Sequence, residues 1–434
     1  MRQMKDSGIE WIGEIPENWN TRRIKHLADT SIQNNFIDGD WIESPDIEDE
    51  GIRYLTTGNV GDGCYKEQGN GYISLETFQK LNCKYAYPND YVISRLNAPY
   101  GRSCILPDSF PEYVLAVDIV ILRTNEDKKY LCYTTQCNGY QRSVEDQAKG
   151  TTMKRISRTN LGNIVIPLPS LPEQQAISAH LDRQCAHIDN IIEKTKASIE
   201  EYKKLRQAVI TQAVTKGVRG DRPMKNSGIE WIGEIPEDWN VYRIAALYEE
   251  RNEAGNDELP ILTVSINTGV SDRELSDEES LRVFVRSEDR SKYMKVYPGD
   301  LTYNMMRAWQ GAFGAVRVLG MVSPAYVIAK PKQEIDSRYM EALLRTPAAK
   351  EEMKRHSYGI ADFRMRLYWD YFKIIKVCFP TLSEQKEIAD YIDTKCAEID
   401  TLISKKEQFL TELDSYKKSM IYEYVTGKKE VPIA

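Results

Sequence analysis

The chain has 434 residues, which is enough for about three domains of ordinary size. Its 65 acidic side chains outnumber its 58 basic ones and give a formal net charge of −7. This balance argues against a protein that coats nucleic acid regardless of sequence, because neutralising phosphates needs a surplus of Lys and Arg. The sequence shows no signal peptide, no apolar run of about 18 residues that could span a membrane, and no CxxC pair among its eight cysteines. We therefore expect a soluble cytoplasmic protein with reduced thiols, without membrane association and without a metal site.

A short segment near the N-terminus occurs twice. Residues 4–20 read MKDSGIEWIGEIPENWN and residues 224–240 read MKNSGIEWIGEIPEDWN, so only two positions differ. Its large apolar residues could pack on an adjoining domain or dock a partner, and we favour packing because such side chains are usually buried. They are Trp11, Ile12, Ile15 and Trp19, and then Trp231, Ile232, Ile235 and Trp239.

Residues 1–170 predict a first α/β domain. Strand-like runs at 90–94 and 117–122 are separated by turn signals such as the Tyr-Pro-Asn-Asp sequence at 87–90. Two segments carry residue types that read DNA, since Arg can grip guanine and Asn can grip adenine at two points. Any single one of them could equally be a solvated surface residue. The candidates are Arg95, Asn97, Tyr100, Arg102, Lys149, Thr151, Thr152, Lys154, Arg155 and Arg158.

Residues 171–217 predict a long helix that follows a Leu-Pro-Glu-Gln sequence and ends at Gly217. Its sequence repeats with alternating steps of four and three residues, which is the heptad pattern of a coiled coil. The predicted seam is Ile177, Leu181, Gln184, Ile188, Ile191, Thr195, Ser198, Tyr202, Leu205 and Val209.

Residues 218–380 predict a second α/β domain that begins with the repeated segment. Strand-like runs occur at 259–264 and 325–329, and the Tyr-Pro-Gly-Asp turn at 297–300 corresponds to that at 87–90. The candidate DNA-contacting residues in this domain are Asn304, Arg307, Trp309, Gln310, Tyr358, Arg364 and Arg366.

Residues 381–434 predict a second long helix and a C-terminal tail. The helix follows a Leu-Ser-Glu-Gln sequence, ends before Gly427 and repeats the heptad pattern. Two ordinary amphipathic helices, each packed on its own domain, are the alternative; heptads this long favour a facing helix. The predicted seam is Ile388, Ile392, Lys395, Ile399, Leu402, Lys406, Phe409, Leu413, Tyr416 and Met420.

The order domain, helix, domain, helix favours antiparallel packing of the two helices, because the chain then closes on itself. The predicted fold class is α+β, with two α/β target-recognition domains separated by two long helices that form an antiparallel coiled coil, as a pseudo-two-fold internal repeat. The repeated segments and helices stayed alike while the domains diverged. Like surfaces suit two copies of one partner, and unlike domains suit two different targets.

The EWIGEIPExW segment, the Leu-Pro-Glu-Gln or Leu-Ser-Glu-Gln sequence before each long helix, and the order of the four parts resemble type I restriction-modification specificity subunits. The resemblance covers essentially the whole chain. It implies that the chain reads a bipartite site in double-stranded DNA and assembles with two methyltransferase subunits and with restriction (translocase) subunits. It also implies that S-adenosylmethionine, ATP and Mg act on the partner subunits and that this chain binds no cofactor.

The residues themselves indicate no catalytic site. No GxxxxGK[ST] sequence is present, and residues 97–100 differ from the Asn-Pro-Pro-Tyr loop of adenine methyltransferases at Ala98. The four histidines show no ligand spacing. We therefore expect a non-catalytic subunit; the alternatives are a protein-only scaffold with twin ligand-binding domains and a single-chain enzyme.

Overall fold

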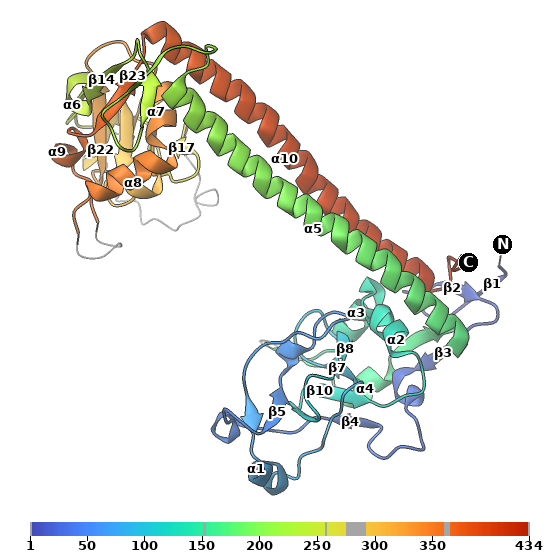
Figure 1. The fold of residues 1–434 in the computed structure, drawn as a ribbon. Coiled ribbons are helices and arrows are strands. Elements are labelled where there is room, and N and C mark those ends of the chain that lie inside the picture. The colour runs from blue at the N-terminus through green and yellow to red at the C-terminus, as the bar shows by residue number, and fades with distance from the viewer. Residues whose placement is uncertain (1, 151–152, 257, 275–291, 360–364, 433–434) are drawn as a thin grey trace. The chain divides into compact units, whose positions relative to one another are not determined.

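A computed structural model describes residues 2–150, 153–256, 258–274, 292–359 and 365–432 of the protein. The chain forms two compact units, which we call unit 1 (Met1–Thr195 with Glu407–Ala434) and unit 2 (Lys196–Lys406). Each unit combines small sheets and short helices with a segment of both long helices, α5 (Leu171–Lys216) and α10 (Leu382–Val425) (Figure 1).

Unit 1 is built around a four-stranded antiparallel sheet in the order β4-β10-β7-β8. The central strands, β7 and β10, are buried along their whole length, which explains their continuous apolar sequence. The strands of unit 1 are β1 (Met4–Asp6), β2 (Glu14–Pro16), β3 (Asn20–Arg23), β4 (Phe36–Asp38), β5 (Ile52–Leu55), β6 (Tyr72–Ile73), β7 (Tyr91–Ser94), β8 (Ser103–Ile105), β9 (Tyr113–Leu115), β10 (Ile119–Leu122) and β11 (Val165–Leu168). Its short helices are α1 (Leu75–Lys80), α2 (Lys128–Thr135), α3 (Asn138–Glu145) and α4 (Arg158–Asn163).

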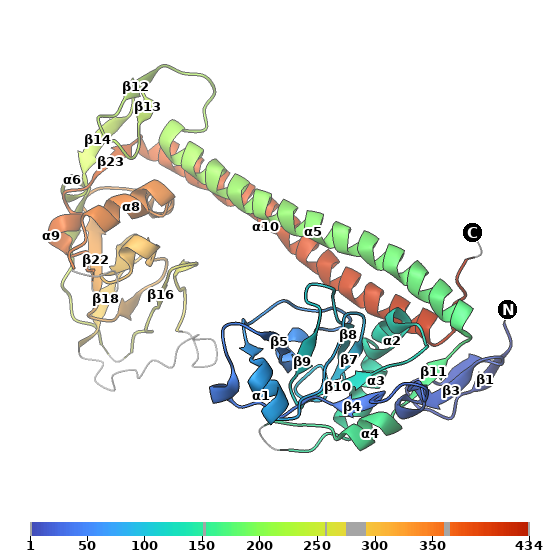
Figure 2. The same cartoon turned by 60° about the horizontal axis from the view of Figure 1, so that its bottom comes forward.

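Unit 2 contains a sheet of the same kind, in the order β15-β22-β19-β20. Helix α7 contacts β20 as α2 contacts β8 in unit 1. The strands of unit 2 are β12 (Met224–Asn226), β13 (Glu234–Pro236), β14 (Asn240–Arg243), β15 (Tyr248–Glu250), β16 (Val264–Ser265), β17 (Gly269–Val270), β18 (Met294–Val296), β19 (Leu301–Asn304), β20 (Phe313–Ala315), β21 (Gly320–Val322), β22 (Tyr326–Pro331) and β23 (Lys376–Phe379). Its short helices are α6 (Ile244–Leu247), α7 (Ser337–Leu344), α8 (Pro347–Arg355) and α9 (Trp369–Phe372) (Figure 2).

The strand predicted at 259–264 is only partly right. Regular pairing begins at Val264, whereas residues 260–262 make backbone contacts to Met321 alone. The predicted run therefore divides between two partners, Met321 for residues 260–262 and residues 269–271 for residues 263–265.

The two units share strand registers, which makes their positions comparable one by one. In unit 1 Ile93 of β7 lies opposite Ser103 of β8, and in unit 2 Tyr303 of β19 lies opposite Phe313 of β20. The connecting loops, 95–102 and 305–312, therefore have the same length and the same place in the sheet. The internal repeat predicted from the sequence is confirmed at the level of strand order and register.

The segments of α5 and α10 run antiparallel within each unit, as predicted. In unit 1 His180 stacks on Tyr424 and Lys417 pairs with Asp189 at 2.6 Å, so residue numbers rise along one helix and fall along the other. In unit 2 the corresponding ion pair joins Arg206 to Asp400 at 3.0 Å.

The predicted seam of α5 is correct at Ile177, Leu181 and Ile188 and wrong at Gln184, which is exposed. Its neighbour Cys185 is buried in its place. The buried residues still repeat every seven, as Leu181, Ile188 and Thr195 do, so the prediction placed only the second position of each heptad one residue off. The same offset explains why Leu205 is exposed and the neighbour of Ser198 is buried, and why Leu402, Phe409 and Tyr416 on α10 are exposed.

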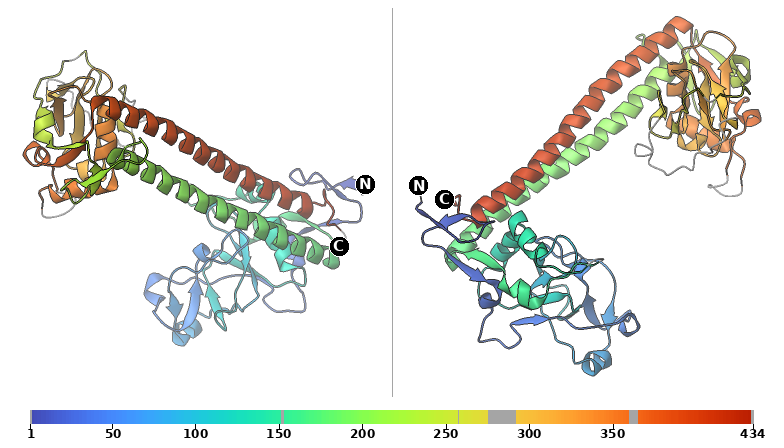
Figure 3. Two further views of the ribbon diagram at one scale, coloured as in Figure 1. Left: turned by 45° about the horizontal axis from the view of Figure 1, so that its top comes forward. Right: turned by 180° about the vertical axis from the view of Figure 1, so that it is seen from behind.

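The repeated segment is packed inside each unit, as we favoured. Trp19 and Trp239 are each 1% exposed, and Ile15 and Ile235 belong to the same two apolar cores. In unit 1 the chain ends lie beside each other (Figure 3), since Lys428 donates to the carbonyl of Ile12.

The Glu of each Leu-Pro/Ser-Glu-Gln sequence binds an Arg that covers the buried Trp. In unit 1 Arg2 lies over the Trp19 ring and pairs with Glu173 at 2.6 Å. In unit 2 the same three roles belong to Arg222, Trp239 and Glu384. This contact ties the repeated segment to the start of a long helix.

The Gln of the same sequence is buried and joins the long helix to a short one. Gln174 accepts a hydrogen bond from the backbone N–H of Asp127, ahead of α2, and donates to the carbonyl of Pro169. In unit 2 these roles belong to Gln385, Asp336 and Pro380. The repeated Glu-Gln pair is therefore a structural joint.

A buried tyrosine on the short helix completes the joint. The Tyr130 hydroxyl contacts the carbonyls of Pro167 and Val425, both at 3.0 Å. In unit 2 these positions are Tyr339, Cys378 and Val214. In each unit the same hydroxyl thus joins a short helix and one strand, β11 or β23, to the last turn of a long helix.

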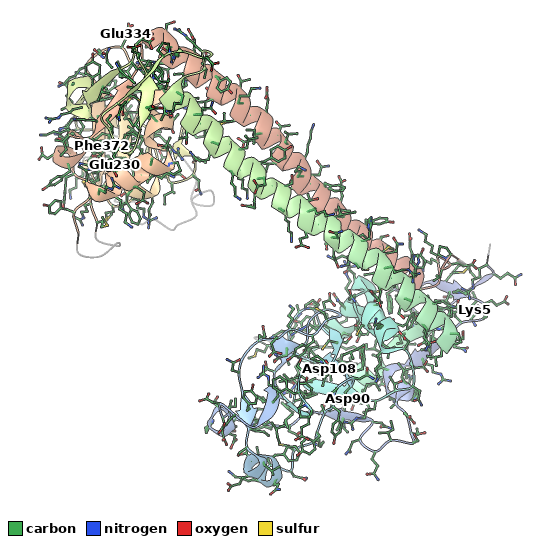
Figure 4. The ribbon with its side chains drawn as sticks, in the orientation of Figure 1. Lys5, Asp90, Asp108, Glu230, Glu334 and Phe372 are labelled. Carbon is green, nitrogen blue, oxygen red and sulfur yellow. The ribbon has the colours of Figure 1, made fainter. Side chains whose placement is uncertain are left out.

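The turn before each central strand is held by the same contacts in both units, although the arginine that makes them follows a different strand in each. Asp90, labelled in Figure 4, accepts from the backbone N–H of Tyr87, and Arg123 pairs with it and lies over the tyrosine ring. In unit 2 the three residues are Asp300, Tyr297 and Arg251. Arg123 follows β10, whereas Arg251 follows β15, so the same contact arose from different strands.

In the part of the chain that the structure describes, no helix combines the length and apolar character needed to cross a bilayer.

Candidate nucleic-acid interface

The two predicted DNA-contacting segments of unit 1 lie side by side. Loop 95–102 joins β7 to β8, and Leu96 in it forms an antiparallel bridge with Arg155. The backbone N–H of Ile156 donates to the carbonyl of Arg95 at 3.1 Å. Residues more than fifty positions apart in the sequence therefore share one surface.

The corresponding segments of unit 2 are joined in the same way. The N–H of Leu367 donates to the carbonyl of Met305 at 2.8 Å, as Ile156 does to Arg95. Tyr358 and Arg366 exchange backbone hydrogen bonds, as Lys149 and Arg155 do in unit 1. Each unit thus presents a loop and a neighbouring turn at the same edge of its sheet.

Several of the unit 1 candidates are open to solvent. Asn97, Lys149 and Lys154 are exposed, and the side chains of Arg155 and Arg158 are 40% and 42% exposed. Tyr100 is half-buried against the core. Thr151 and Thr152 lie outside the described residues.

Arg95 does not point into solvent. It is 6% exposed, and its guanidinium donates to the carbonyls of Val117 and Ile156. Burial lowers the pKa of Arg95, and the carboxylates of Asp38 and Asp118 oppose that shift. The side chain therefore holds the backbone at Ile156 next to the sheet.

Arg102 organises its own loop. Its Nη1 donates to the carbonyls of Leu96 and Asn97, and its Nε donates to the carbonyl of Val60 at 2.6 Å. Asn97 itself has a left-handed backbone, with φ of 61°. The guanidinium of Arg102 therefore fixes the backbone shape of the segment that presents Asn97.

In unit 2 the exposed candidates are aromatic, amide and basic. Tyr358 is 64% exposed and stacks on Tyr371, with ring centroids 4.8 Å apart, and Arg366 and Gln310 are also exposed. Sequence reasoning missed Tyr371, which the fold brings beside Tyr358. Arg364 lies outside the described residues.

The remaining unit 2 candidates lie in the turn after β19. The side-chain oxygen of Asn304 accepts from the N–H of Met306 at 2.9 Å. Trp309 is half-buried and donates to the carbonyl of Met306, with the Lys354 ammonium over its ring. Arg307 is half-buried and precedes the short 3-10 turn Ala308–Gln310.

Beneath the unit 1 surface lies a network of charges that sequence reasoning also missed. Asp118 contacts Arg155 at 2.5 Å and Arg95 at 3.6 Å. Asp38 contacts Arg95 at 3.2 Å and Arg158 at 3.5 Å. Neither carboxylate carries a local sequence signal, because Asp38 ends β4 and Asp118 lies in the turn before β10, both distant in the sequence from 155–158.

The equivalent positions of unit 2 lack these charges. The shared strand registers place Met305 where unit 1 has Arg95, Ala325 where it has Asp118, and Asn252 where it has Asp38. Trp369 is the first residue of α9, as Arg158 is the first residue of α4. Of the five compared positions in unit 2, only Arg366 carries a charge, and it corresponds to Arg155. The two surfaces therefore share a backbone frame and differ in chemistry.

Comparisons with known proteins agree with this duplicated frame. A family model described as the type I restriction modification DNA specificity domain matches residues 16–201. The chain is 25% identical to a putative type I restriction enzyme MjaX specificity subunit of Methanocaldococcus jannaschii, over 97% of this chain and 96% of that protein. It is 22% identical to the type I restriction enzyme EcoBI specificity subunit of Escherichia coli, over 79% of this chain and 74% of that one.

Two solved structures share the fold. One, from work on complex assembly and conformational transition of the type I R-M system, superposes with a TM-score of 0.69 over 96% of this chain and 99% of that chain, at 11% identity. The other, the HsdS subunit of Thermoanaerobacter tengcongensis, gives 0.57 over 96% and 98%, at 12% identity. Along nearly its whole length this chain is similar to the specificity subunits of type I restriction-modification systems, and its residues 16–201 match their DNA specificity domain.

Proposed function

We propose that this protein reads a bipartite sequence in double-stranded DNA, with one half-site for each unit. The observation that carries the proposal is the pair of equivalent edge surfaces, which keep one backbone frame and present different side chains. Because the backbone frame is the same in both units, both units can dock on duplex DNA in the same way. Because their side chains differ, each unit can read a different half-site.

The proposed partners are two methyltransferase subunits and the restriction subunits. In each unit the paired helices leave apolar side chains exposed, Phe409 and Tyr416 in unit 1 and Leu205 and Leu402 in unit 2. We assign these side chains to contacts with the methyltransferase subunits, because the helices are a repeated part of the chain and like surfaces suit two copies of one partner. S-adenosylmethionine, ATP and Mg then act on the partners, in the cytoplasm, and this chain positions them without catalysis.

Binding of duplex DNA to the complex with methyltransferase subunits tests the proposal. Raising the salt from about 50 to about 200 mM should weaken binding steeply, because each neutralised phosphate releases counterions. A complex that binds no duplex, or binds it equally at both salt concentrations, would overturn the DNA-reading proposal. The purified chain incubated with S-adenosylmethionine and DNA should give no methylation; turnover would overturn the non-catalytic part.

A domain exchange tests the division into two half-sites. Replacing residues 20–170 with the corresponding block of another specificity subunit should change the preferred bases in one half-site only. A change in both half-sites would contradict independent reading by the two units.

A further inference from the structure

Asp38 and Asp118 are unexpected on a surface that would face DNA. A carboxylate near phosphate groups repels them, and these two side chains remain 31% and 17% exposed. The presence of these carboxylates is explained if they hold the neighbouring arginines in position.

The contact between Asp118 and Arg155 is an ion pair in which Oδ1 of Asp118 lies 2.5 Å from Nε of Arg155 without forming a hydrogen bond, while the arginine side chain stays 40% exposed. With its Nε beside the carboxylate, the guanidinium keeps Nη1 and Nη2 as a pair of donors, and that pair matches the two acceptors N7 and O6 of guanine.

Arg158 is supported from the other end of the network. It begins α4, and its Nη1 lies 3.5 Å from Asp38. Arg95 lies between the two carboxylates, and its bond to the carbonyl of Ile156 anchors the residue between the two exposed arginines. One buried cation therefore fixes both carboxylates and the backbone that carries Arg155 and Arg158.

We propose that Asp118 and Asp38, held by Arg95, orient the guanidinium groups of Arg155 and Arg158 so that they read guanine in the half-site of unit 1. Asp38, Asp118 and Arg95 are positioning residues, and Arg155 and Arg158 touch the bases. An arginine that is fixed before binding loses less side-chain freedom on the DNA, which sharpens its preference for guanine. This inference rests on the proposed function.

Among the described residues of unit 2 the three supporting positions are uncharged, since they are Met305, Ala325 and Asn252. The proposed orientation of arginines therefore concerns the half-site of unit 1, and the half-site of unit 2 serves as an internal reference in each experiment.

Selection from a randomised duplex library by the complex with methyltransferase subunits tests the inference. The wild-type complex should select a half-site that contains guanine, assigned to unit 1 by the domain exchange. Asp118→Asn and Asp38→Asn should each reduce the preference for guanine at a position in that half-site by about 10-fold, the lower part of the range for losing a good base contact. Overall binding of unselected duplex should stay equal or rise, because a negative charge has been removed, and the half-site of unit 2 should be unchanged.

Glu145→Gln is the matched control. Glu145 pairs with the exposed Lys154 on the same surface, with both side chains nearly half exposed, so the charge change is the same without a supporting role. It should leave the selected bases unchanged.

Arg155→Lys and Arg158→Lys separate base reading from simple attraction, and they serve if an aspartate variant does not fold. Lysine keeps the charge but loses the planar pair of donors, so the salt dependence should persist while the guanine preference falls. If the wild type selects a sequence and all four variants select the same one, the inference is wrong and the proposed function stands. If the wild type selects no sequence, the proposed function fails.

Discussion

The two units have the same joint and different reading surfaces. The joint repeats residue for residue: Tyr130 and Tyr339 contact equivalent carbonyls, and Gln174 and Gln385 make equivalent hydrogen bonds. At the edge of the sheet, by contrast, a network of five charged side chains in unit 1 corresponds to a largely uncharged set in unit 2. Positions that hold the sheet to the helices have kept their chemistry, and positions that face outward have not.

The largest effect should come from the shared joint. Trp19→Ala and Trp239→Ala each remove a side chain that is 1% exposed and should lower the stability of their own unit by about 3–5 kcal/mol. Hydrogen exchange read peptide by peptide would measure each unit separately. Similar losses in the two units are expected; a unit that tolerates the change would show that the joint is not equivalent in the two repeats.

A smaller effect should distinguish the two copies of the Glu-Arg contact. Glu384 is 1% exposed and Glu173 is 24% exposed. Glu384→Gln should therefore cost about 2–3 kcal/mol, since it weakens a buried charged hydrogen bond, and Glu173→Gln about 1 kcal/mol or less. Thermal unfolding of both variants checks the order, and equal shifts would mean that burial of the carboxylate does not set the strength of this contact.

Alkaline pH should affect unit 1 before unit 2. Burial raises the pKa of Cys132 and Cys137 in unit 1, each to about 12, and that of Cys378 in unit 2 to about 12. A thiol whose pKa is raised by folding loses its proton first in the unfolded chain, so stability is present below the ordinary value of 9.0 and falls as the pH rises toward 12. Each such thiol contributes at most about 1.4 kcal/mol per pH unit in that window.

The measurement is hydrogen exchange of both units between neutral and alkaline pH. Cys137→Ala should flatten the pH dependence of unit 1 and leave that of unit 2 unchanged. The prediction would be falsified if unit 2 lost protection at the lower pH.

The smallest effect concerns two equivalent exposed positions, Lys149 and Tyr358. Lys149→Ala should reduce the slope of log affinity against log salt by about 0.9, as expected for one lost phosphate contact. Tyr358→Ala removes no charge and should leave that slope unchanged. Titrations of the complex with duplex DNA at several salt concentrations would decide, and equal changes in slope would contradict the different chemistry of the two surfaces.

Much of the fold follows from the sequence, because its signals are local. Heptad spacing and the glycines after Lys216 and Thr426 gave both long helices, and the apolar runs at 91–94 and 119–122 gave the central strands of unit 1. The seam of the helices was placed one residue off at every second position, because steps of three and then four residues fit a heptad as well as four and then three, and neighbours such as Leu402 and Ile403 are both apolar. The strand predicted at 259–264 was overestimated because its residues divide between two pairing partners that are distant in the sequence.

The sequence predicted which segments form the candidate site, but not what each residue does in it. Arg95, Arg102 and Arg155 look alike in the sequence, yet the first is buried, the second binds the carbonyls of its own loop, and the third is partly exposed. Asp38 and Asp118 carried no signal at all, because their importance depends on neighbours from other strands.

The sequence by itself determined the duplication, the two long helices and the segments on which the reading surfaces lie, since repeats and periodicity are properties of the order of residues. Only the tertiary structure decided which arginine faces outward and which carboxylate stands behind it. Those contacts join residues that strand pairing brings together from distant parts of the chain, and no local pattern encodes them.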